Sequence, residues 1–242
     1  MQRSFRGRAT ATTLLAGCGL LVLAVLMIAF PAFAHTVAEG DQGYIQEITG
    51  AHVVPFGYLG AKHMVTGYDH LLFLFAVIFY LHRLRAIALY VTLFAIGHST
   101  TMLLAVFLQI AVSAYVVDAI IGLSVVYMAL DNMGAYRRWF GVQPNAKVAT
   151  LAFGLVHGLG LATKIQEFGM APDGLVANLL AFNVGIEAGQ ILALTAILIA
   201  MGYWRRTSSF RRHAYAANVV LLTAGLLLVG YQTAGYVLLE SL

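Results

Sequence analysis

Residues 175–204 read LVANLLAFNVGIEAGQILALTAILIAMGYW. One charged side chain, Glu187, lies within an apolar run that is longer than the about 20 residues a helix needs to cross a bilayer. The whole chain shares this character, because 61% of its 242 residues are hydrophobic and only 10% are charged. Soluble domains carry about 25% charged residues, so the composition excludes an ordinary water-soluble protein and predicts lipid as the surrounding solvent.

Six apolar segments of this kind follow one another after residue 55. In lipid, every backbone polar group must be paired within its own segment, and these segments lack the alternation of barrel strands. The predicted fold class is therefore an all-α polytopic membrane protein, a six-helix transmembrane bundle. The predicted helices cover residues 56–81, 86–110, 114–134, 148–166, 175–204 and 214–239.

Residues 1–34 are predicted to be a cleaved N-terminal signal peptide. They begin with three arginines, continue through an apolar stretch and end in Pro31-Ala-Phe-Ala34, a small-residue cleavage pattern. An uncleaved first transmembrane helix is the alternative, because the apolar stretch is long for a signal sequence. Residues 35–55 are more polar and are predicted to form a short extracytoplasmic segment, and residues 56–242 form the transmembrane domain.

Basic residues predict the orientation in the membrane. Arg83 and Arg85 lie in the first connection between the predicted helices, and further basic groups lie in the third and fifth connections. The other connections hold almost none, so the positive-inside rule places both mature termini outside the cytoplasm of a bacterial cytoplasmic (inner) membrane. The formal net charge of +4 does not indicate nucleic-acid binding, because no basic stripe with interleaved aromatic residues lies outside the apolar segments.

Ionisable side chains within membrane spans are costly and indicate a functional site. The single cysteine, Cys18, excludes a multi-cysteine metal site, so a metal would be held by His, Asp, Glu or Asn. Imidazole ligands suit divalent Ni, Co, Zn or Cu, and carboxylates offset the charge of the ion. The candidate metal-interacting residues are His63, Asp69, His70, His98, His157, Asn183 and Glu187.

His63 and His70 share a face of the first predicted helix, but their backbones are about 10 Å apart along a straight helix. Both rings cannot then bind one ion at the about 2.1 Å typical of imidazole ligands. Two alternatives remain open: the two histidines form two successive ion-binding stations, or the helix is distorted near Thr66-Gly67. Asp69 lies about 100° around the helix from His70, so it is expected to accept a hydrogen bond from a histidine on another helix.

The fifth predicted helix carries a polar face. Asn183, Glu187 and Gln190 follow i, i+4, i+7 spacing, which predicts that all three point at neighbouring helices rather than at lipid. Gly185-x-x-x-Gly189 in this helix and Gly154-x-x-x-Gly158 in the fourth place small residues one turn apart. These glycines either support ordinary close packing of helices or make room around the neighbouring polar side chains.

Four motifs stand in order along the chain at these positions. They are His63-Met-Val-Thr-Gly-Tyr-Asp69-His70-Leu-Leu, Gly97-His98-Ser99, Phe153-Gly-Leu-Val-His157-Gly-Leu-Gly160 and Phe182-Asn183-Val-Gly-Ile-Glu187. Over roughly residues 56–192 the sequence resembles the HupE/UreJ family, membrane accessory proteins linked to hydrogenase and urease for which nickel permeation is the accepted idea. Met64 stands where the better-studied branch has proline, so the chain is more similar to a divergent second branch. The resemblance implies that the metal interacts with His63, Asp69, His70, His98, His157 and Glu187.

The leading functional prediction is a membrane permease or facilitator that passes Ni²⁺, or a similar ion such as Co²⁺, inward. The expected partners are the lipid bilayer and the divalent ion, with no nucleotide, because no phosphate-binding loop occurs; no permanently bound cofactor is expected, and a homo-oligomer is left open. One alternative is a non-transporting metal- or haem-binding protein with His98 and His157 as axial ligands. Another is an intramembrane hydrolase that pairs Ser99 or Ser124 with a histidine.

Overall fold

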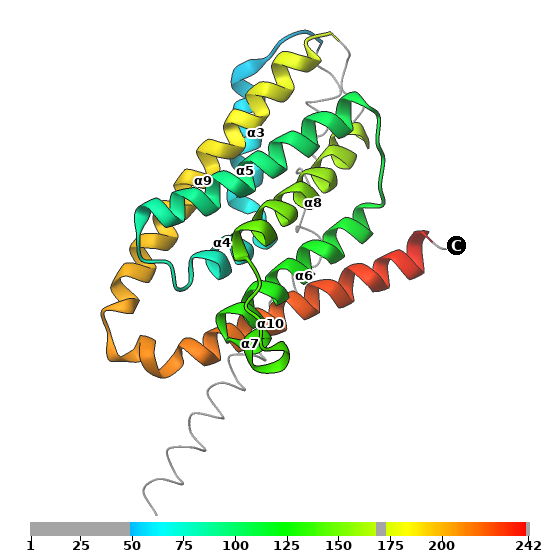
Figure 1. Cartoon of the computed structure of the whole chain (residues 1–242). Helices are drawn as coiled ribbons and strands as arrows, with labels where there is room; N and C mark the ends of the chain where they lie inside the picture. The colour runs from blue at the N-terminus through cyan, green and yellow to red at the C-terminus, as the bar shows by residue number, and fades with distance from the viewer. Residues whose placement is uncertain (1–48, 168–172, 241–242) are drawn as a thin grey trace, which may run out of the picture.

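The computed structural model describes residues 49–167 and 173–240, and all regular elements within them are helices (Figure 1). The predicted signal peptide lies outside these residues, as does most of the predicted extracytoplasmic segment 35–55. An all-α membrane fold is confirmed for the part of the chain that the structure describes.

Five helices in the described part are long and apolar enough to cross a membrane. They are α5 (Leu84–Phe107), α6 (Ala114–Asn132), α8 (Ala146–Glu167), α9 (Leu175–Arg205) and α10 (Ser208–Gly235). The first four agree with the prediction to within a few residues. The last begins at Ser208 instead of residue 214 and continues into a π-helical turn, η1 (Tyr236–Glu240), while the short α7 (Ala135–Phe140) in the connection after α6 was not predicted.

The first predicted span is interrupted, so a continuous helix over 56–81 is wrong. The chain forms α3 (Val53–Thr66) and α4 (Tyr68–Ile78), separated by Gly67 in an extended conformation with φ −72° and ψ 101°. A side chain at Gly67 has no room, because its Cβ would lie 2.9 Å from His70 Nδ1 and 3.1 Å from the carbonyl oxygen of His63. Glycine is therefore required here by close approach.

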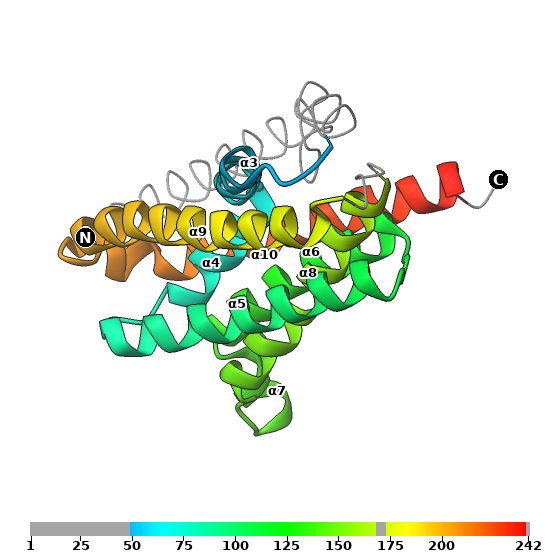
Figure 2. The ribbon, with the colours of Figure 1, turned by 90° about the horizontal axis from the view of Figure 1, so that it is seen from above.

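The long helices pack in three pairs, α3 with α9, α5 with α8, and α6 with α10 (Figures 1 and 2). Each pair is formed by helices that are not neighbours in the sequence. The short helix α4 lies in the centre and contacts α3, α5, α6, α9 and α10. The histidine at its start is therefore surrounded by helices from most of the chain.

Glycines set the close approach within these pairs. A Cβ at Gly185 of α9 would lie 1.9 Å from the carbonyl oxygen of Gly57 in α3, and one at Gly154 of α8 would lie 2.4 Å from the carbonyl oxygen of Phe94 in α5. Gly122 of α6 and Gly225 of α10 meet in the same way. The glycine motifs on α8 and α9 therefore allow helix backbones to touch, as small residues do in membrane proteins.

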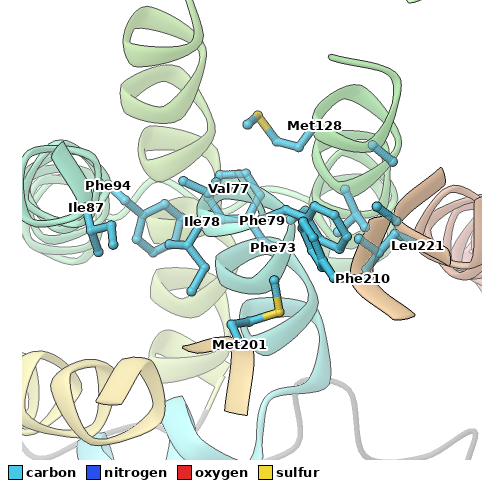
Figure 3. Packing of buried hydrophobic residues seen from close by; sticks show 14 residues of the cluster. Phe73, Val77, Ile78, Phe79, Ile87, Phe94, Met128, Met201, Phe210 and Leu221 are labelled. Atoms are coloured by element: carbon cyan, nitrogen blue, oxygen red, sulfur yellow. The ribbon is translucent and has the colours of Figure 1, made fainter. Parts of the chain in front are cut away.

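An apolar cluster surrounds the C-terminal half of α4 and fixes its position (Figure 3). Phe73 of α4 and Phe79, directly after its last residue, are fully buried, and the Phe79 ring stacks on Phe210 of α10 at 5.6 Å between ring centroids. The ring centroid of Phe73 lies 5.1 Å from that of Phe94 in α5. Burial of rings of this size supplies much of the packing energy that holds so short a helix.

Arg205 at the end of α9 caps α4. Its guanidinium donates hydrogen bonds to the backbone carbonyls of Leu81 at 2.9 Å and Phe79 at 2.7 Å, and also to that of Ile78. The last carbonyls of a helix have no partner within the helix, and an unpaired carbonyl within a membrane protein is costly. Arg205 therefore stabilises the C-terminal end of α4 and the start of the connection that follows it.

Candidate functional site

Four histidines from four helices meet at the break between α3 and α4. The His70 ring centroid lies 5.3 Å from that of His63, which is in the last turn of α3. It lies 6.0 Å from the ring of His98 in α5 and 5.2 Å from the ring of His157 in α8. His63 is 7% exposed and the other three are each 1% exposed, so this histidine cluster is enclosed by protein.

The break at Gly67 brings His63 and His70 together. On a straight helix their backbones would be about 10 Å apart along the axis, yet their rings are in edge-to-face contact. Of the two alternatives left open by the sequence, the structure has the distorted helix. The interruption therefore changes two stations into one shared cluster.

Asp69 is bonded to the neighbouring His70, which corrects the expectation of a partner on another helix. His70 Nδ1 lies 2.9 Å from Asp69 Oδ1, and both side chains are buried. The prediction assumed a continuous helix in which the two side chains diverge, whereas both lie in the first turn after the break. Because a carboxylate can only accept, Nδ1 donates and Nε2 carries the lone pair that can bind a cation.

Aromatic rings enclose the histidine cluster. His157 lies 4.9 Å from Phe94 and 5.3 Å from Phe73 between ring centroids, and His98 stacks on Phe94 at 5.9 Å. These rings occupy the space beside His157 that a porphyrin would need. The arrangement therefore gives no support to a haem held between His98 and His157.

Ser124 and Ser99 were the candidate nucleophiles of a hydrolase. The Ser124 hydroxyl is fully buried and donates to the carbonyl of Ile121 at 2.6 Å, although its oxygen also lies 3.4 Å from His157 Nε2. The Ser99 hydroxyl donates to Asn183 Oδ1 at 3.0 Å rather than to a histidine. Neither serine has the base-activated hydroxyl, accessible to substrate, that hydrolysis needs.

The three polar residues of α9 divide between interior and surface. Gln190 is 2% exposed, and Asn183 is partly buried and bonded to Ser99 of α5. Glu187 is exposed, although it is on the side of α9 that faces α5. It lines a cavity of about 530 Å³ between α5 and α9, together with Ser99, Gln190 and mainly apolar side chains.

The histidine cluster is an arrangement of pairs. Two imidazoles that share one ion at about 2.1 Å have ring centroids roughly 5 Å apart, close to the separations around His70. Within residues 49–167 and 173–240, however, no three His, Cys, Asp or Glu side chains are grouped closely enough to hold a metal ion together. The described histidines therefore meet as pairs of rings around His70.

A buried ion pair was not singled out from the sequence. Lys164 Nζ of α8 lies 3.4 Å from Asp118 Oδ2 of α6, near the helix ends opposite to the arginine-containing connections. The available signal was Lys164 itself, a basic residue beside a connection that the positive-inside rule predicts to be poor in basic residues. Asp118 does not form a recognisable sequence motif with Lys164, because the two residues are distant in the sequence.

A sequence profile described as HupE / UreJ protein matches residues 39–240 of the chain. No curated protein and no solved structure matched it. The match includes all four helices that supply the histidine cluster.

Proposed function

The chain belongs to the HupE/UreJ family, and on that premise we propose that it is a facilitator that passes Ni²⁺ or Co²⁺ through the membrane. The family consists of membrane accessory proteins related to nickel and cobalt transport. The single observation that carries the proposal is the meeting of four buried histidines at a helix break. Imidazole nitrogen is a good ligand for both ions.

His70 is the central residue in the proposed path. It neighbours His63, His98 and His157, so an ion bound by one pair of rings can move to another with His70 as the shared ligand. Asp69 keeps His70 in one tautomer and supplies a negative charge beside the ion. Conduction needs sites that are favourable enough to enter and weak enough to leave, and paired ligands meet that need.

The helix break also contributes to the electrostatics of the path. The C-terminal end of α3 carries the negative end of its helix dipole, which favours a cation beside His63. The positive N-terminal end of α4 is offset by Asp69 in its first turn. Interrupted helices with ends at membrane depth are typical of transporter ion sites.

The proposed direction of ion movement is into the cytoplasm, and the connections rich in basic residues are proposed to lie on the cytoplasmic side. Arg83, Arg137 and Arg206 lie in or beside connections at one end of the bundle, and the positive-inside rule supports a cytoplasmic position for that end in a bacterial cytoplasmic membrane. Both mature termini are then extracytoplasmic, in agreement with a cleaved signal peptide. The driving force is the ion gradient or a partner protein, since the sequence contains no nucleotide-binding loop.

Metal uptake into proteoliposomes tests the proposal. The wild-type chain is expected to admit Ni²⁺ or Co²⁺ in preference to Zn²⁺ and Cu²⁺, measured with a metal indicator trapped inside the vesicles. His70→Ala is expected to lower uptake by more than about tenfold, because it removes the ligand shared by all pairs. His213→Ala is the matched control, because His213 is exposed at the start of α10.

Two results would contradict the proposal. Equal uptake by wild type and His70→Ala would show that ions do not pass through the histidine cluster. No uptake of any ion by correctly folded wild-type protein would exclude a facilitator and favour a sensing or assembly role.

A further inference from the structure

Asp118 and Lys164 form a buried ion pair between α6 and α8. Their side chains are 6% and 13% exposed, and Lys164 Nζ lies 3.4 Å from Asp118 Oδ2. Burying two charges costs desolvation energy that an ion pair often fails to repay. A charged pair inside a membrane protein is therefore more economically explained by a function than by stability alone.

The pair lies on the same side of α8 as His157. Lys164 and His157 are at i, i+7 spacing, which places them on one face and about 10 Å apart along the helix. On α6, Ser124 contacts His157 at 3.4 Å, and Asp118 lies toward the helix N-terminus from it. The ion pair is therefore about two helical turns from the histidine cluster, toward the end opposite to the arginine-containing connections.

The Asp118 carboxylate lies over α8 beside Gly160. A Cβ built at Gly160 would lie 3.7 Å from Asp118 Oδ1 and 3.0 Å from the side chain of Val117. Gly160 stands between His157 and Lys164 in the sequence of α8. The carboxylate thus lies beside the segment of α8 that connects the ammonium group to the histidine cluster.

The geometry of the Asp118–Lys164 pair permits a cation to replace the Lys164 ammonium at the Asp118 carboxylate. Closely bonded charged pairs have N···O distances of about 2.7–2.9 Å, so the 3.4 Å separation is loose. Lysine presents a compact charge on a flexible stem, and its ammonium can leave a carboxylate without disturbing the backbone. A divalent cation would attract the same carboxylate more strongly than the monovalent ammonium does.

We infer that Asp118 and Lys164 form an entry gate for the divalent cation. The Asp118 carboxylate takes the arriving ion, and the Lys164 ammonium, which occupies that carboxylate when no ion is present, moves away. The ion then continues along α8 to His157. This inference rests on the proposed facilitator function and adds a recognition step outside the histidine cluster.

Opposite effects of the two neutralising substitutions test the gate. Asp118→Asn removes the receiving carboxylate and is expected to raise the half-saturating metal concentration for uptake by about tenfold. Lys164→Gln removes the competing ammonium and is expected to lower that concentration several-fold. Asp173→Asn and Lys147→Gln are the matched controls, because both residues are exposed, and both are expected to behave as wild type.

Stability measurements separate the gate from a merely structural ion pair. A structural pair predicts that both substitutions lower the melting temperature and impair uptake in the same direction. Lys164→Arg, which keeps the positive charge, is expected to keep the half-saturating concentration at or above that of wild type. If Lys164→Gln fails to fold, Asp118→Asn is compared with Lys164→Arg instead, and the half-saturating concentration of Asp118→Asn is expected to be the higher of the two.

The outcomes distinguish this inference from the proposed function. If wild-type uptake depends on His70 while Asp118→Asn leaves the half-saturating concentration unchanged, or Lys164→Gln raises it as Asp118→Asn does, the gate is wrong and the facilitator stands. If folded wild-type protein admits no ion, both are wrong.

Discussion

His70 illustrates how much of the site depends on one side chain. Its ring contacts three other histidine rings, and its Nδ1 donates to Asp69. Under the proposed function, Asp69 acts on the ion through His70 as well as by its own charge. This makes Asp69 a positioning residue whose effect can be separated from that of a ligand.

We predict that Asp69→Asn weakens ion uptake without unfolding the protein. The amide oxygen can still accept from His70 Nδ1, so the ring orientation is retained, but the negative charge beside the ion is lost. The half-saturating metal concentration is expected to rise by about tenfold in the vesicle assay, with the melting temperature near that of wild type. Unchanged ion affinity would contradict the positioning role.

The histidines of the site could be predicted from the sequence, whereas the contacts of the carboxylates could not. Ionisable residues inside apolar membrane segments are energetically costly and therefore indicate a functional site. His98 and His157 were predicted on this basis. The partner of Asp69 depends on a local change of helix direction, and the exposure of Glu187 depends on how closely α5 and α9 approach. Neither property is contained in residue spacing.

The broken helix is the element that creates the site. The half-helix α4 (Tyr68–Ile78) is held by apolar contacts along its length, by Gly67 at its start and by Arg205 at its end. Each of these three supports can be removed separately. The break itself was difficult to predict, because the chain has 24 glycines and most of those in the described residues lie within helices without interrupting them.

Gly67→Ala is expected to impair uptake. The backbone angles at this position suit alanine, so the cost comes from the added Cβ, which would meet His70 Nδ1 at 2.9 Å and Asp69 Oδ1 at 3.1 Å. We expect uptake to fall by about tenfold through displacement of the His70 ring. Gly202→Ala is the control, because nothing lies within 4 Å of a Cβ at Gly202. Equal uptake by the two variants would contradict the requirement for close approach.

Arg205→Ala is expected to destabilise the protein. It leaves backbone carbonyls at the end of α4 without their guanidinium donor, at a cost of roughly 1–3 kcal/mol for each group that finds no replacement. The expected result is a lower melting temperature in detergent, measured by intrinsic fluorescence, with partial recovery in Arg205→Lys. Arg206→Ala is the control, because Arg206 is exposed, and it should melt as wild type does.

At the scale of the whole molecule, the three helix pairs leave one open seam. Few residues of α5 and α9 contact each other, and the cavity with Glu187 on its surface lies between them. A carboxylate at this position is open to reagents from the membrane, while Asp69 is enclosed. The two acidic residues that the sequence grouped together therefore have different access.

Labelling with a lipid-soluble carbodiimide tests this difference. We expect Glu187 to be modified in detergent-solubilised or vesicle-embedded protein, and Asp69, at 1% exposure, to remain unmodified, as determined by mass spectrometry of peptides. The Glu187→Gln variant should lose the modification. Labelling of Asp69 in folded protein would contradict the enclosure of the histidine cluster.

The spans could be predicted from hydropathy, because lipid requires long apolar helices whatever their neighbours. The pairing of helices could not, because small residues show that a face is suited to close packing and do not identify its partner. Gly185 illustrates this, since its neighbour across the interface is Gly57, at the other end of the described chain.

The same pairing has a consequence for how the protein is made. Translation proceeds from the N-terminus, so α3 and α4 are synthesised long before α9 supplies the surface against which α3 packs and the arginine that caps α4. Contacts of such high sequence separation form late and expose incomplete interfaces in the meantime. At 11 residues, α4 is too short to cross a bilayer by itself, so the segment that carries His63 and His70 stays incompletely packed until the second half of the chain has been inserted.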